Sequence, residues 1–99
     1  MSFRVRYTRA ARDDLRRLQA HLAAHDPALA RRARDAISKA VSLLKDFPFT
    51  CRKATGHLAF LRELVIPFGG AGYVMLFEIE GAATVTILAV RHQRQDDYF

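Results

Sequence analysis

The stretch from Leu22 to Leu29, LAAHDPAL, decides how the first half of the chain folds. Asp26 followed by Pro27 signals the start of a helix, because the carboxylate accepts from free first-turn amides and proline there loses no hydrogen bond. Apolar residues on both sides of this break recur at the spacing of amphipathic helices, and the second stripe stops at Phe47-Pro48. The sequence therefore predicts a helical hairpin. Its two stripes are Ala11, Leu15, Leu18 and Leu22, then Leu29, Ala33, Ala36, Ile37, Ala40, Val41 and Leu44.

A short strand precedes the hairpin. Phe3, Val5 and Tyr7 alternate with polar residues, which is the period of a half-buried strand. Thr8 follows directly and is expected to cap the first helix through its hydroxyl.

The second half of the chain reads as strands. Residues 49–60 lack a clear period and are expected to be irregular, whereas 61–68, 73–80 and 84–91 are expected to be strands. Residues 74–77 and 87–90 are apolar at consecutive positions, which predicts strands that are central or covered on both faces. The glycines at 69–72 lead into a strand rather than a helix, so they indicate a turn and not a phosphate-binding loop. The order β-α-α-β-β-β over residues 1–99 predicts one α+β domain, a helical hairpin packed on a small, mostly antiparallel sheet.

The charge of the chain is unevenly distributed. The 99 residues include 16 Lys and Arg against 10 Asp and Glu, a net charge of +6. Residues 1–46 carry all of this excess, and residues 47–99 are neutral. A basic chain favours a polyanionic partner, and this division favours an acidic protein bound to the helices over RNA bound to the sheet.

Composition excludes several classes. The apolar content argues against disorder, and no apolar run is long enough to span a bilayer. The single cysteine, Cys51, and the absence of an apolar leader fit the cytoplasm. His21 and His25 lie one helical turn apart without a third ligand, so no metal site is predicted, and no cofactor motif is present.

The polar C-terminus follows a buried strand, so its side chains are expected to emerge at the end of the sheet, which is a common place for a site. Arg62, His92, Arg94 and Tyr98 together would suit metal-free RNA cleavage. One of these groups would deprotonate the 2′-OH, arginine would stabilise the phosphorane, and another group would protonate the leaving oxygen. The alternative is that Arg94, Asp96 and Asp97 only form surface ion pairs, and composition leaves both interpretations open.

The order of elements resembles the ParE/RelE toxin superfamily of bacterial type II toxin–antitoxin systems. The resemblance extends over essentially the whole chain and depends on the order of several weak motifs. These are the break at Asp26-Pro27, the segment RELVIPF at 62–68, Gly72-Tyr73 at the next strand, and AVRHQR at 89–94.

The superfamily contains ribosome-dependent mRNA endonucleases, similar to RelE, and inhibitors of DNA gyrase, similar to ParE. Val74 follows Gly72-Tyr73 where the nucleases commonly carry a phosphate-binding arginine. Together with the neutral second half and the long helices, Val74 favours a gyrase-poisoning toxin that is not an enzyme. Arg62, His92, Arg94 and Tyr98 keep the endonuclease as the alternative.

The resemblance also implies the partners. A cognate acidic antitoxin, of the ribbon–helix–helix type and similar to ParD, is expected to neutralise the toxin and to make all contacts with operator DNA. The expected antitoxin-binding residues are Arg12, Arg16, Arg31, Arg34, Leu64 and Ile66. The expected target-binding residues are Arg91, His92 and Arg94.

Overall fold

The helical hairpin forms where the sequence predicts it. The computed structural model describes residues 2–54 and 60–94, in which α1 (Arg9–His25) is followed after one residue by α2 (Pro27–Leu44). The backbone N–H of Asp26 donates to Leu22 at the end of α1. Its carboxylate accepts from the amides of Ala28 and Leu29 at the start of α2, at 3.0 and 3.3 Å. One residue therefore ends the first helix and caps the second.

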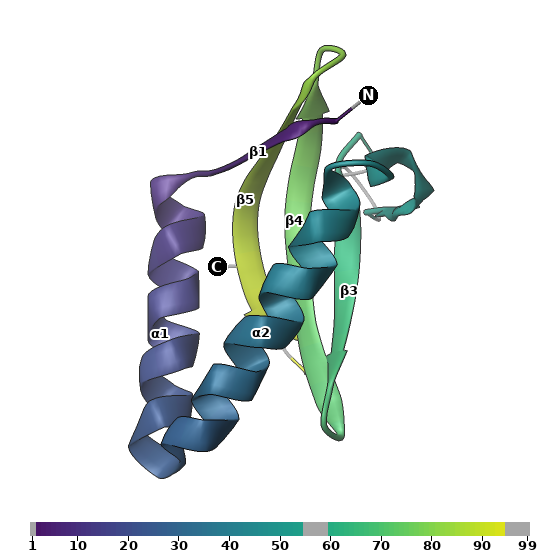
Figure 1. The fold of residues 1–99 in the computed structure, drawn as a ribbon. Coiled ribbons are helices and arrows are strands. Elements are labelled where there is room, and N and C mark those ends of the chain that lie inside the picture. The colour runs from purple at the N-terminus through teal and green to yellow at the C-terminus, as the bar shows by residue number, and fades with distance from the viewer. Residues whose placement is uncertain (1, 55–59, 95–99) are drawn as a thin grey trace.

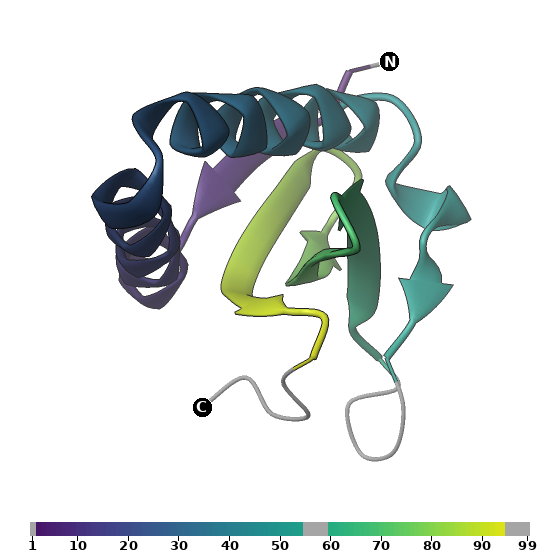
Figure 2. The same ribbon diagram turned by 90° about the horizontal axis from the view of Figure 1, so that it is seen from below.

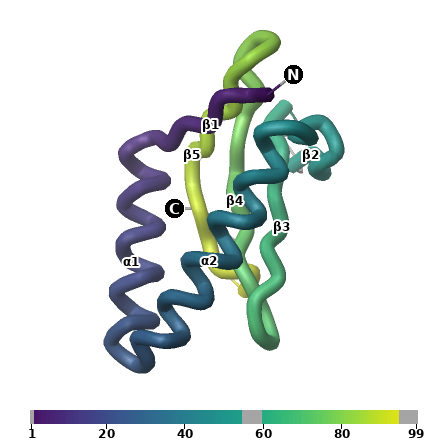
Figure 3. Tube along the Cα trace, viewed as in Figure 1, coloured from purple at the N-terminus to yellow at the C-terminus, as the bar shows by residue number. Residues whose placement is uncertain are grey.

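The strands form a single mixed sheet. They are β1 (Arg4–Tyr7), β2 (Arg52–Lys53), β3 (Arg62–Phe68), β4 (Ala71–Glu80) and β5 (Thr84–His92), in the spatial order β1-β5-β4-β3-β2. β1 pairs with β5 in parallel, and the other neighbours are antiparallel (Figures 1 and 3). The predicted α+β architecture is confirmed. The stretch 49–60, predicted to be irregular, contains β2 and most of a short 3-10 helix, η1 (Pro48–Thr50).

Both helices lie on one face of the sheet, here called the helix face (Figure 2). Alternate residues of the central strand β4, Tyr73, Met75 and Phe77, point into the core beneath the helices. Val74 and Leu76 lie on the opposite, open face and are nevertheless only 2% and 3% exposed. The consecutive apolar residues of β4 are therefore buried on both faces, as their sequence predicts.

A β-bulge interrupts the pairing of β4 with β5. Leu76 pairs with Ala89 and Phe77 pairs with Ile87, so Leu88 has no partner in the ladder. The extra residue reverses the alternation of side chains along the rest of β5. Val90 consequently joins Ile87 in the core on the helix face, and Ala89 packs on the open face.

In the part of the chain that the structure describes, neither helix has the length and apolarity needed to cross a membrane.

Candidate functional site

A groove is lined by residues of α1, α2 and β1. The two helices diverge toward β1 (Figure 1). The groove has a volume of about 430 Å³. Its apolar lining includes Leu15 from α1 and Ile37 and Val41 from α2, together with Tyr7 from β1. The Gln19 side chain links the helices where they lie closer, by donating to the Ala30 carbonyl at 3.1 Å. The groove therefore has a largely apolar lining, and a polar contact joins the helices beside it.

Cations border this groove. Arg16, Arg34 and Lys45 are among its lining residues. Arg16 is also paired with Asp13 at 2.8 Å, on the exposed side of α1. The structure thus brings together Arg16 and Arg34, two of the four arginines predicted to bind an antitoxin. Arg12 and Arg31, the other two, are exposed on the same helices.

Leu64 and Ile66 lie in the core and not on the surface where a partner could contact them. Both were predicted as antitoxin contacts, but they lie in the core of the helix face, 7% and 1% exposed. Strand alternation directs these two side chains under α2, and the exposed apolar residue of β3 is Val65, between them. Their side chains are therefore unavailable to a partner in this structure.

The end of β5 carries the predicted target-binding residues. Arg91 lies on the open face, where its guanidinium approaches Glu63 at 3.8 Å. The backbone N–H of Arg94 donates to Nδ1 of His92 at 3.2 Å, and the His92 ring meets Tyr73 edge-on, 5.9 Å between centroids. Burial raises the pKa of the Tyr73 hydroxyl. Arg91, His92 and Arg94 therefore share one end of the sheet but do not all share one face.

Arg62 does not join this group. It lies on the helix face of β3 and pairs with Phe77, whereas His92 pairs with Tyr73, four residues away along β4, or about 13 Å. Its Nη1 donates to the carbonyls of Phe49 and Cys51, at 3.2 and 2.7 Å. Tyr98 lies outside the described residues. The proposed nuclease set is therefore not assembled around Arg62.

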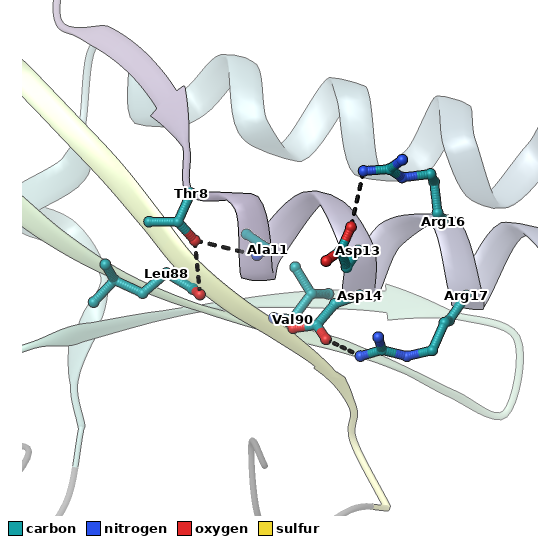
Figure 4. A network of polar contacts seen from close by, with 8 residues as sticks. All are labelled: Thr8, Ala11, Asp13, Asp14, Arg16, Arg17, Leu88 and Val90. Atoms are coloured by element: carbon teal, nitrogen blue, oxygen red, sulfur yellow. Dashed lines mark hydrogen bonds and ion pairs between the residues drawn. The ribbon is translucent and has the colours of Figure 1, made fainter.

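Two acidic residues that were not predicted from the sequence, Glu63 and Asp14, contact β5. Glu63 accepts from Arg52 at 2.9 Å on the open face, in addition to its contact with Arg91. Asp14 of α1, paired with Arg17, accepts from the Val90 amide at 2.9 Å (Figure 4). Asp14 is an acidic residue at a position of an amphipathic helix that should be partly buried. This was the signal in the sequence that could have identified it.

Among residues 2–54 and 60–94, no three His, Cys, Asp or Glu side chains are grouped so that they could hold a metal ion. Burial raises the pKa of the Cys51 thiol, and the nearby Arg62 charge lowers it in part. A thiol in this environment is a poor nucleophile, because the thiolate is the reactive form.

Several solved structures share this fold, including two that are similar over nearly the whole chain. The chromosomal ParDE toxin–antitoxin system of P. aeruginosa is similar over 96% of this chain and 98% of the other, with a TM-score of 0.74 and 21% identity. The toxin–antitoxin complex RelBE2 of Mycobacterium tuberculosis is similar over 96% and 95%, with a TM-score of 0.64 and 24% identity. No curated protein matches the sequence. The family model of the ParE toxin of type II toxin–antitoxin systems, parDE, matches residues 5–97. The chain therefore belongs to the ParE toxin family.

Proposed function

We propose that this toxin arrests growth by poisoning DNA gyrase, trapping it on cleaved DNA, and that it does not cut mRNA. The observation that supports this choice is the placement of the sheet arginines. Arg91 and Arg52 both approach Glu63 on the open face, and Arg62 lies on the other face, beside Phe77 and away from His92.

A metal-free ribonuclease needs cations that are free to meet the charge that develops on the phosphorane. The Arg91 side chain is only 14% exposed and lies beside a carboxylate. Val74, which pairs with Arg91 across the strands, offers no charge to a phosphate. Surface contacts with a protein target require none of these groups, so the geometry suits an inhibitor better than a nuclease.

The antitoxin half of the proposal depends on the groove. Its apolar lining and its three cations complement an amphipathic acidic segment, which would bury apolar side chains between the helices and place carboxylates beside Arg16, Arg34 and Lys45. The two solved structures named above are both of toxin–antitoxin systems. We propose a ribbon–helix–helix antitoxin similar to ParD, whose tail fills the groove and whose own domain contacts operator DNA.

Two assays on the purified toxin test the target. Supercoiling by gyrase should be inhibited, with accumulation of cleaved DNA, and mRNA on translating ribosomes should stay intact. Arg94→Ala, at an exposed residue just after β5, should weaken gyrase inhibition, with Arg32→Ala on α2 as the matched exposed control. Codon-specific mRNA cleavage that His92→Ala abolishes would contradict the gyrase proposal and establish the endonuclease in its place.

A further inference from the structure

An aromatic surface lies beyond the C-terminal end of α2. Phe49 is 61% exposed and Phe60 is 76% exposed, although they are large apolar side chains. Phe47 and Leu43 are also exposed in the same part of the chain. Isolated exposed apolar side chains are ordinary on protein surfaces, but clustered ones mark interaction sites.

Phe49 and Phe60 border a cleft of about 260 Å³, which is also lined by Arg62, Ile79 and Gly81. The cleft exists because α2 ends at Leu44, so the helix does not cover Ile79 near the end of β4. η1 takes the place of the helix there and presents Phe49 at the edge of the cleft.

Arg62 gives the cleft a charge. Its Nη1 is occupied by the carbonyls of Phe49 and Cys51, and its guanidinium lies 5.6 Å from the centre of the Phe49 ring. Its Nε and Nη2 groups have no hydrogen-bond partner within residues 2–54 and 60–94. These donors match the two oxygens of a carboxylate. The complementary ligand is therefore an apolar side chain with an acidic residue beside it.

Phe3 contacts both the groove between the helices and the cleft. Phe3 donates its backbone N–H to the carbonyl of Lys45, a groove residue, at 2.6 Å. The Phe3 ring meets Phe49, a cleft residue, edge-on with 6.0 Å between centroids. An extended chain leaving the groove at Lys45 would pass Phe3 and reach the cleft without crossing the sheet.

We propose that the cleft is a second anchor site for the acidic antitoxin, which inserts an apolar side chain between Phe49 and Phe60 and pairs a neighbouring carboxylate with Arg62. This inference rests on the antitoxin part of the proposed function, and the identity of the toxin's target does not affect it. A single-stranded nucleic acid would also stack on aromatic rings, but its backbone requires a track of cations. Among the described residues that line the cleft, Arg62 is the only charged one.

Phe60→Ser tests the proposal, because Phe60 is largely exposed and its loss should not disturb the fold. The probe is the purified antitoxin proposed above, titrated by calorimetry. We expect its affinity to fall at least tenfold, as for an aromatic anchor residue. Val65→Ser, an exposed apolar residue on the opposite face of β3, is the matched control and should change affinity less than twofold (about 0.4 kcal/mol).

A second comparison tests the charge. Arg62→Gln should reduce the salt dependence of binding, whereas Phe60→Ser should leave the salt dependence unchanged. Unchanged antitoxin affinity in Phe60→Ser would overturn the proposal. Loss of gyrase inhibition in Phe60→Ser with unchanged antitoxin affinity would also overturn it. The same holds if an oligothymidine strand binds in a Phe60-dependent way and the antitoxin does not displace it. If gyrase proves not to be the target but Phe60→Ser still weakens antitoxin binding, the second anchor stands.

Discussion

The Oδ2 atom of Asp14 accepts a hydrogen bond from the backbone amide of Val90 at 2.9 Å, joining α1 to β5 across 76 positions of the chain. β1 ends at Tyr7, so it does not reach this part of β5. Side chains of the residues that follow β1 form hydrogen bonds with this part of β5 instead. The Thr8 hydroxyl donates to the Leu88 carbonyl at 3.1 Å, and Asp14 binds the next free amide along that edge (Figure 4).

Asp14→Ala should destabilise the protein by about 1–3 kcal/mol, because the mutation leaves the buried Val90 amide without its acceptor. In a domain of this size that loss lowers the melting temperature by roughly 4–8 °C per kcal/mol. Thermal unfolding followed by circular dichroism measures the change. Asp13→Ala removes only the exposed pair with Arg16, so it should have almost no effect. If the two variants lost the same stability, the contact with Val90 would contribute no more than the exposed ion pair.

Gly72→Ala should destabilise the β3–β4 hairpin. A Cβ at this position would lie 2.1 Å from the carbonyl oxygen of Ile66, so the backbone of one strand would have to move. Overpacking of this kind costs about 1–3 kcal/mol, which urea denaturation can detect. Gly70→Ala is the control, because no atom lies within 4 Å of its added Cβ. A Gly72→Ala variant as stable as Gly70→Ala would contradict the close approach of these strands.

Arg34→Glu should weaken antitoxin binding about tenfold, or about 1.4 kcal/mol, mainly by slowing association. The substitution reverses a charge at the groove, where the proposed antitoxin segment is acidic. Stopped-flow association at several salt concentrations separates this effect from a change in dissociation. Arg32→Glu gives the chain the same net charge but changes a residue outside the groove lining. The groove is not the docking site if the two variants lose the same affinity.

Cys51 should react slowly with iodoacetamide near neutral pH, compared with an unburied thiol. Burial raises the pKa of its thiol, so less thiolate is present until the pH rises above the ordinary range for cysteine. Arg62→Gln removes the charge that partly offsets the rise, and should slow the reaction further. Because the chain has a single cysteine, mass spectrometry follows the reaction at this site alone. Faster alkylation in Arg62→Gln would mean that Arg62 mainly shields Cys51.

The elements with a local chemical signal were predictable from the sequence. Asp26-Pro27 specifies a helix junction through hydrogen bonds to residues two and three positions away, so no distant contact is needed to recognise it. Thr8 was recognised as a cap for the same reason, and it does accept from the Ala11 amide at 3.1 Å. Its second bond, to Leu88, depends on the tertiary fold and was not predictable.

The site residues were harder to predict, because strand alternation decides their face and neighbouring strands decide their partners. Leu64 and Ile66 resemble a docking stripe in sequence but lie beneath α2. Arg62 and Glu63 are neighbours in a strand, so their side chains point to opposite faces. Arg62 donates to a carbonyl near η1, and Glu63 accepts from Arg52. β2 is only two residues long, which is too short to carry a recognisable period.

The bulge at Leu88 decides which face the last residues of β5 occupy. The extra residue is what returns Val90 to the core and keeps Arg91 on the open face beside Glu63. If the same residues paired without a bulge, the alternation would continue unbroken, which would place Val90 on the open face and the Arg91 guanidinium beneath the helices. Deleting Leu88 would remove the bulge and leave the faces of all later residues unchanged, because the remaining residues would then alternate regularly. Comparisons between toxins of this fold should accordingly align the bulge before they compare the residues that follow it.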